Sequence, residues 1–186
     1  MNSSDLLRFL RARSSVREYS GGEPLDPEDI DYILACASTA PSAGNREAWD
    51  VVIVTDDDVR LELASAALEQ VHIREAPAVF VVCANYVRSM SHYGERGILY
   101  ALEDATIACT YMMLAAHARD LHSCWTGGVR GERGSRSSRP SAAYPPPRRA
   151  SRGREGGGRR SNLWSGCRWT STCTARPGRI KHSRRE

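Results

Sequence analysis

Two arginines and two serines stand within five residues near the N-terminus, in the segment Arg13-Ser14-Ser15-Val16-Arg17. In an extended chain alternate side chains share a face, so Arg13, Ser15 and Arg17 can converge on one anion. Guanidinium groups match phosphate oxygens with paired, charge-assisted hydrogen bonds, and hydroxyl groups add shorter contacts. The segment therefore predicts a phosphate site. Arginines at a helix C-terminus are also common without any ligand, so the segment alone leaves a purely structural role open.

A second group of residues could face a planar ligand. It consists of Ala40, Pro41, Ser42, Ala43, Gly44 and Asn45, with Trp49 a few residues later. Small residues with a glycine let the backbone approach a ligand closely, and the Asn45 amide offers a donor and an acceptor to the edge of a heterocycle. The same composition is typical of a plain turn between a helix and a strand. Composition alone favours the plain turn.

Helices are predicted immediately before both of these groups. Ser3 or Ser4 can cap a first helix that ends near Arg13, where a basic last turn suits the helix dipole. A second helix begins at Asp26 and Pro27. It stops before Pro41 and so delivers the chain to the small-residue loop.

The remaining elements follow from apolar patterning. Continuous runs at 51–55 and 78–84 predict two buried strands, with a helix starting at 56–58 between them. From 97 to 118 the sequence is apolar on nearly every helical face, so this helix belongs in a core or a subunit interface. Residues 123–126 predict a third strand. The order of elements is helix, helix, strand, helix, strand, long buried helix, strand.

Several function classes are excluded. The chain has neither GxGxxG after a strand nor a GxxxxGK[ST] loop, which are the standard nucleotide fingerprints. No apolar run approaches the roughly 18 residues of a membrane span, and the start lacks a basic region followed by an apolar one. Cys167, Cys173 and His182 are irregularly spaced and have no evident fourth ligand, so we expect no metal site. We expect a cytoplasmic protein with reduced cysteines and no membrane partner.

In this order, the segments resemble the FMN-dependent nitroreductase family. That family has a basic Arg-x-Ser-x-Arg/Lys segment, a Pro-Ser-x-x-Asn-x-Gln-Pro-Trp loop leading into a strand, and a long helix before a Ser-x-Trp-x-Gly stretch. The corresponding sequences here are RSSVREY, APSAGNREAWDVVIV and YGERGILYALEDATIACTYMMLAAHARDLHSCWTGG. Glu47 and Ala48 stand where the family usually has Gln and Pro. The resemblance runs from about Leu6 to Val129 and implies an α+β fold, with a nitroreductase-like mixed or antiparallel sheet flanked by helices.

The resemblance also implies a site and a reaction. It places Arg13, Ser14, Ser15 and Arg17 on the FMN phosphate and ribityl chain, Pro41, Ser42 and Asn45 at the flavin ring, and the backbone of Thr126 and Gly127 at the ring's far edge. Family members are homodimers with two FMN molecules at the subunit interface, each contacted by both chains. NADH or NADPH reduces the flavin, which then reduces a nitroaromatic, a quinone or a similar small-molecule acceptor in a ping-pong cycle. The cofactor carries this chemistry, so no catalytic side chain is assigned.

The charge of the chain changes sign after Val129. Residues 1–129 hold 10 basic and 19 acidic residues, whereas residues 130–186 hold 16 basic and 3 acidic ones. In the second part only Leu163 and Ile180 are large aliphatic residues, too few to offset the entropy of ordering the chain. We therefore divide the chain into a C-terminally incomplete flavin-binding domain, 1–129, and a basic Arg/Gly/Ser/Pro-rich tail, 130–186, that is disordered or frame-shifted and adds no strand to the sheet.

Three interpretations of the tail compete. It could bind RNA or DNA, it could wrap the partner subunit, or it could be the frame-shifted translation of a GC-rich gene. We favour the frameshift because the composition changes abruptly in the middle of a recognisable fold. The alternative function is a nucleic-acid-binding protein that acts through this Arg-rich tail, with residues 1–129 as a dimerising module. For the flavoprotein, we expect only nonspecific contact with nucleic acid.

Overall fold

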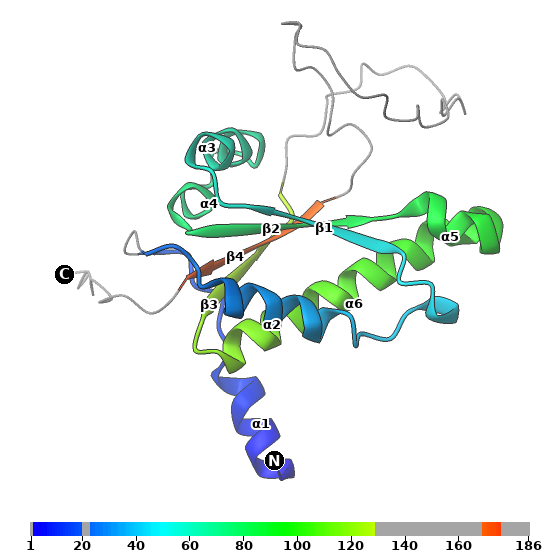
Figure 1. Cartoon of the computed structure of the whole chain (residues 1–186), viewed down its shortest axis with the longest axis horizontal. Helices are drawn as coiled ribbons and strands as arrows, with labels where there is room; N and C mark the ends of the chain where they lie inside the picture. The colour runs from blue at the N-terminus through cyan, green and yellow to red at the C-terminus, as the bar shows by residue number, and fades with distance from the viewer. Residues whose placement is uncertain (1, 20–22, 129–168, 176–186) are drawn as a thin grey trace, which may run out of the picture.

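The computed structural model describes residues 2–19, 23–128 and 169–175, which form an antiparallel sheet between two layers of helices (Figure 1). The strand order is β1-β2-β4-β3, and every neighbouring pair is antiparallel. The strands are β1 (Trp49–Val54), β2 (Ala78–Ala84), β3 (His122–Thr126) and β4 (Trp169–Ala175). The predicted α+β class, with an antiparallel sheet flanked by helices, is confirmed.

Six α-helices and two short 3-10 helices accompany the sheet in the described residues. The α-helices are α1 (Ser3–Ala12), α2 (Pro27–Ala37), α3 (Asp57–Ala66), α4 (Val71–Glu75), α5 (Tyr86–Tyr93) and α6 (Gly97–Ala118). The 3-10 helices are η1 (Ala43–Asn45) and η2 (Gly94–Arg96). In Figure 1, α2 and α6 lie on one face of the sheet, α3 and α4 lie on the other, and α1 projects away from the body.

Strand β2 supplies side chains to two hydrophobic cores. Phe80 and Val82 pack in the core that includes α2 and α6, and Val79 and Val81 pack in the core that includes α3 and α4. This alternation follows from the two-residue period of a strand. All seven residues of β2 are buried, so the buried strand predicted over 78–84 is confirmed with its bounds.

Helix α6 runs from residue 97 to residue 118, as the apolar pattern predicts. Nine of its residues are buried, and the helix packs against α2, α5 and the sheet. In the described part of the chain, the helical stretch Tyr86–Ala118 is long and apolar enough to cross a membrane by length and composition alone. The core helix of a folded domain passes the same test, and α6 has such packing contacts with α2, α5 and the sheet.

Two local predictions need correction. The first helix is capped by Asn2 and not by Ser3 or Ser4, because the Asn2 side chain accepts from the Asp5 N–H while Asp5 reaches back to the Asn2 N–H. The strand predicted as buried over 51–55 is the edge strand β1, in which exposure alternates and Val52 is 44% exposed. An edge strand is covered on fewer sides than a central one, which a continuous run of valines does not indicate.

The largest correction concerns the basic tail. The expectation that nothing after Val129 adds a strand is wrong, because β4 lies between β2 and β3 and pairs with both. The sequence of β4, WTSTCTA, has no large aliphatic residue, but threonine is a good strand former. The sheet is therefore four-stranded in this structure. The rest of 130–186 lies outside the described residues, so the domain division and the interpretations of the tail stay predictions.

The C-terminus of α6 offers a stabilising substitution. Asp120 has a left-handed backbone with φ 56°, its N–H donates to the His117 carbonyl, and the Leu121 N–H donates to the Ala116 carbonyl at 2.9 Å. This is a Schellman motif with an aspartate where glycine is preferred. We expect Asp120→Gly to raise the free energy of unfolding by about 0.5–1 kcal/mol, measured by chemical denaturation.

The matched control is Asp120→Ala. It removes the same negative charge from the helix C-terminus but keeps the Cβ that disfavours the left-handed backbone. If the alanine variant is stabilised as much as the glycine variant, the helix dipole and not the backbone conformation accounts for the gain.

Candidate cofactor-binding site

The basic segment lies along β3. Arg13 is the C-cap of α1, and the chain beyond it is extended. Ser15 forms a parallel bridge with Ser123, and the Val16 N–H donates to the Ser123 carbonyl at 3.3 Å. The segment predicted to bind phosphate is thus placed beside the sheet by backbone pairing.

The charges of both arginines in this segment, Arg13 and Arg17, act on the same residue of β3, Cys124. Burial raises the pKa of the Cys124 thiol, and the positive charges of Arg17 and Arg13 partly oppose that rise. Neither guanidinium forms an ion pair within 4 Å in the described residues. Ser14, Ser15 and Arg17 are exposed, and Arg13 is half-buried. Two nearby cations with no ion-pair partner in the described part of the chain fit a phosphate group.

The end of β3 joins this basic segment in one cluster. Thr126 is buried, and its hydroxyl lies 2.8 Å from Nε2 of His72 in α4. Gly127 is exposed, and the side chain of Gln70 donates to the Gly128 carbonyl at 3.1 Å. The structure therefore brings the predicted phosphate residues and the predicted Thr126–Gly127 backbone to one end of the sheet. His72 and Gln70 were not predicted, and their only sequence signal is polarity just before a buried strand.

Burial lowers the pKa of His72, and the nearby charge of Arg17 lowers it further, against a smaller opposing effect of Glu75. The folded pKa is thus below the unfolded value, so between the two values the unfolded chain binds more protons. We expect the free energy of unfolding to fall as the pH drops below about 6.5, by at most about 1.4 kcal/mol per pH unit from this group.

The measurement is denaturant unfolding of the FMN-free protein at several pH values between 7.5 and 5. His72→Gln should flatten the acid side of the profile, and His92→Gln, which changes an exposed histidine of α5, should not. If the free energy of unfolding of the His72→Gln variant falls with decreasing pH as steeply as that of the wild type, His72 is not the group responsible.

The small-residue loop has an unusual backbone. Gly44, Asn45 and Glu47 have left-handed φ angles of 55°, 53° and 45°. The Ser42 hydroxyl accepts from the Glu47 N–H at 3.0 Å, while Pro41 and Asn45 are exposed. Left-handed non-glycine residues are held only where the surrounding structure determines them, often at ligand sites.

A buried carboxylate beneath the loop was not predicted. Asp104 of α6 is 2% exposed and accepts from the Ala43 N–H at 2.8 Å and from the Ala48 N–H at 3.1 Å. In the sequence, Asp104 is only a polar interruption of an apolar helix. Its partners are 61 and 56 residues away along the chain, so no local pattern indicates them.

Within one chain the loop and the basic segment lie apart. The loop is bonded to Asp104, whereas the end of α1 lies near His117, whose Nε2 is 3.1 Å from the Phe9 carbonyl. These two α6 residues are thirteen positions apart, a rise of about 20 Å. Figure 1 shows the loop with η1 and the base of α1 at different ends of α6. One chain therefore does not bring all nine predicted site residues together.

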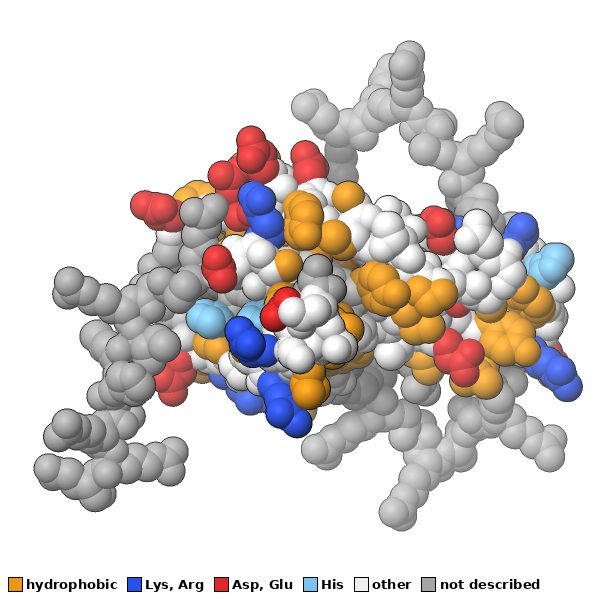
Figure 2. Space-filling model, turned by 90° about the horizontal axis from the view of Figure 1, so that it is seen from below, with side chains coloured by type: hydrophobic (Ala, Val, Ile, Leu, Met, Phe, Trp, Pro, Cys, Tyr) orange, Lys and Arg blue, Asp and Glu red, His pale blue; other side chains and the backbone are white. Residues whose placement is uncertain are grey.

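Two uncovered surfaces could meet a second copy. Leu6, Leu7 and Leu10 of α1 are 43–49% exposed. On α6 the exposed side chains include Thr106 and Thr110, whose hydroxyls donate to carbonyls of their own helix. Such a face can be covered without leaving hydroxyl donors unpaired. Figure 2 shows hydrophobic patches, together with basic side chains, on the face from which α1 projects.

No metal centre is evident in this part of the chain: no group of three or more His, Cys, Asp or Glu in the described residues could hold an ion. Cys36, Cys83, Cys109 and Cys124 form no disulfide among the described residues. Cys167 and His182, which we considered as metal ligands, lie outside the described residues.

The sheet and helices define a known class of fold. A structure described as an FMN-dependent nitroreductase from Clostridium difficile superposes with a TM-score of 0.55 at 29% identity, covering 64% of this chain and 65% of that one. The arrangement of an antiparallel sheet, a long core helix and the loop before β1 is thus the nitroreductase fold.

The chain belongs to the nitroreductase family, whose sequence profile matches residues 10–74 and 67–137. A putative NADH dehydrogenase/NAD(P)H nitroreductase of Archaeoglobus fulgidus is 32% identical over 123 residues, which cover 66% of this chain and 67% of that protein. An NADH dehydrogenase of Thermus thermophilus is 30% identical over 119 residues, covering 62% and 58%. The chain thus spans about three fifths to two thirds of the length of these relatives.

Proposed function

We propose that this protein is an NAD(P)H-dependent FMN oxidoreductase. The observation that carries the proposal is the pair of guanidiniums, Arg13 and Arg17, which both act on Cys124 of β3 and have no ion-pair partner among the described residues. The names of the relatives include NADH dehydrogenase and NAD(P)H nitroreductase, and the structural relative is described as FMN-dependent. These names support a nicotinamide as the reductant and FMN as the cofactor.

The residues present fit an FMN molecule in two parts. Arg13 and Arg17 would neutralise the phosphate, and the exposed hydroxyls of Ser14 and Ser15 would donate to it or to the ribityl chain. Pro41, Ser42 and Asn45 would form a wall for the ring, and the N–H groups at Thr126 and Gly127 would approach its far edge. FMN, when bound, supplies the hydride chemistry. The chain's own work is to hold the ring and to aim donors at the edge where charge gathers.

A second copy of the chain completes this site in our proposal. The loop is anchored on Asp104 and the base of α1 lies near His117, two residues about 20 Å apart along α6, so the two groups lie toward different ends of this helix in one chain. In a two-fold dimer, the basic segment of one subunit can face the loop of the other, which gives two equal sites. The exposed leucines of α1 and the exposed face of α6 support such an interface.

The electron acceptor in this proposal is a nitroaromatic, a quinone or a similar small molecule that follows the nicotinamide into the same stacking position. This gives a ping-pong cycle in which no side chain acts as acid or base. We also propose that the protein works in the cytoplasm, where NADH and NADPH are the available reductants.

The test begins with binding of FMN to the full-length chain, followed by anaerobic mixing with NADH and with NADPH. We expect the visible band of the oxidised flavin to be bleached by at least one nicotinamide and restored by a nitroaromatic or a quinone. A folded protein that binds no FMN at tens of micromolar overturns the proposal. If FMN binds but neither nicotinamide reduces it, the proposed function is restricted to flavin binding.

A further inference from the structure

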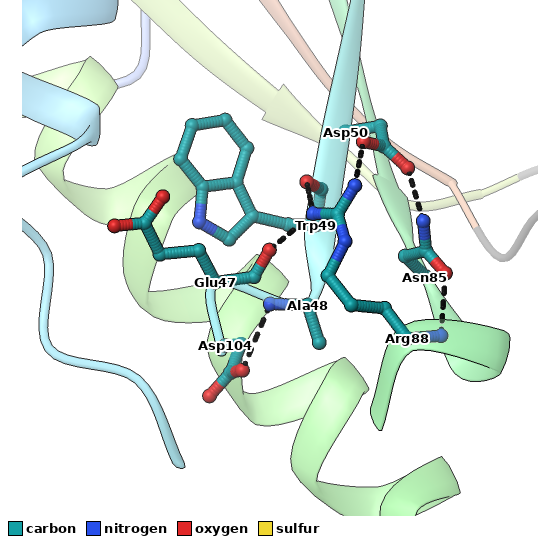
Figure 3. Close-up of polar contacts among 7 residues, drawn as sticks. All are labelled: Glu47, Ala48, Trp49, Asp50, Asn85, Arg88 and Asp104. Atoms are coloured by element: carbon teal, nitrogen blue, oxygen red, sulfur yellow. Dashed lines mark hydrogen bonds and ion pairs between the residues drawn. The ribbon is translucent and has the colours of Figure 1, made fainter. Parts of the chain in front are cut away.

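The small-residue loop is held from two sides by side chains of other elements. On one side, Asp104 of α6 accepts the N–H groups of Ala43 and Ala48. On the other side, Arg88 of α5 donates to the Glu47 carbonyl and to the Trp49 carbonyl at 3.0 Å. Figure 3 shows Asp104 and Arg88 approaching the backbone at 47–49 from separate helices. We call Asp104 and Arg88 the loop clamp.

Arg88 is itself fixed. Its guanidinium donates to Asp50 at 2.8 Å, and the other oxygen of that carboxylate accepts from the Asn85 side chain at 2.7 Å. The Asn85 side chain in turn accepts from the Arg88 N–H at 2.9 Å and so caps α5. The carbonyl side of the clamp is therefore built on the ends of β1 and β2, and its geometry does not depend on a freely rotating side chain.

The loop needs such support because of its backbone. Asn45 and Glu47 adopt the left-handed conformation, which is unfavourable for residues with a Cβ. A strained segment keeps one conformation only where its neighbours determine it. Asp104 satisfies two N–H groups and Arg88 two carbonyl groups around Glu47, so the clamp fixes both ends of the strained stretch.

We propose that Asp104 and Arg88 are positioning residues for flavin binding. They fix the loop that presents Pro41, Ser42 and Asn45, and so set the affinity for FMN and the environment of its ring without contacting it. This inference rests on the proposed function. A preformed loop lowers the entropy that binding must otherwise offset.

The experiment compares Asp104→Asn and Arg88→Gln with two charge-matched controls in α3 and α4, Glu62→Gln and Arg74→Gln. Asparagine keeps one acceptor oxygen but turns an NH₂ group toward a second backbone N–H. In the FMN-free proteins, amide hydrogen exchange is followed for peptides covering residues 41–49. In the loaded proteins, FMN affinity and the visible flavin spectrum are measured.

We expect both clamp variants to exchange faster in 41–49, to bind FMN about tenfold more weakly, comparable to the loss of one hydrogen bond, and to shift the flavin band. The controls should match the wild type. Unchanged exchange overturns the proposal, and so does faster exchange with unchanged affinity and spectrum. If Asp104→Asn fails to fold, Arg88→Gln decides by the same criteria. A wild-type protein that binds no FMN contradicts the proposed function, and exchange alone then tests the clamp.

Discussion

FMN binding is expected to weaken by at least about 100-fold when Arg13 and Arg17 are both replaced by alanine. Each guanidinium would give the phosphate a charge-assisted hydrogen bond worth about 1.5–3 kcal/mol, so removing two costs about 3 kcal/mol or more. Neither side chain forms an ion pair within the described residues, so the fold should persist. Titration of FMN followed by flavin fluorescence gives the affinity.

Riboflavin provides the internal control, because it has the ring and the ribityl chain but no phosphate. The double variant should bind riboflavin about as well as the wild type does. A second control, Arg74→Ala with Arg96→Ala, removes the same net charge from exposed positions of α4 and η2. If riboflavin affinity falls as much as FMN affinity, the arginines support the ring or the fold and not the phosphate.

Local patterns predict the central elements of this fold. Strand β2 and helix α6 have the bounds that their apolar patterns indicate, because each corresponds to a nearly uninterrupted apolar run: all seven residues of β2 are buried, and α6 buries nine residues along its length. Helix α2 also begins where predicted, at Asp26 and Pro27, and the Glu28 N–H donates to the Asp26 carboxylate. In these cases the determinants lie within the element itself or one residue outside it.

The errors arise where tertiary position decides. Strand β1 has the composition of a buried strand but lies at the sheet edge, which depends on the order of strands and not on its own residues. Strand β4 was missed because a count of large aliphatic residues undervalues a threonine-rich segment. A central position between two strands supplies the pairing that its weak local pattern does not indicate.

The candidate site shows the same contrast between features that local sequence predicts and features that tertiary packing decides. The basic segment and the small-residue loop are recognisable from residue types, but their supports are not. Asp104 contacts amides 61 and 56 residues away, and His72 contacts Thr126 across 54 residues. The separation of the two site groups along α6 is likewise a property of packing. The residue types therefore indicate which ligand is expected, and the fold, which separates the two groups, is the basis of our proposal that a second chain completes the site.

That proposal leads to a complementation experiment with two defective chains. The first carries Arg13→Ala and Arg17→Ala, and the second carries Asn45→Gly. Glycine keeps the left-handed backbone at φ 53° and removes only the amide side chain, so we expect FMN binding about tenfold weaker without loop strain. Each homodimer then has two defective sites. Co-expression with two different tags allows the mixed dimer to be purified.

If each site combines the basic segment of one chain with the loop of the other, the mixed dimer contains one fully wild-type site and one doubly defective site. We expect half of its sites to bind FMN with wild-type affinity, although neither parent chain does so. If both groups of a site came from the same chain, both sites of the mixed dimer would be defective. A titration with FMN would then show no sites of wild-type affinity. A mixed dimer with no sites of wild-type affinity excludes the shared site. A chain that stays monomeric at saturating FMN excludes it independently.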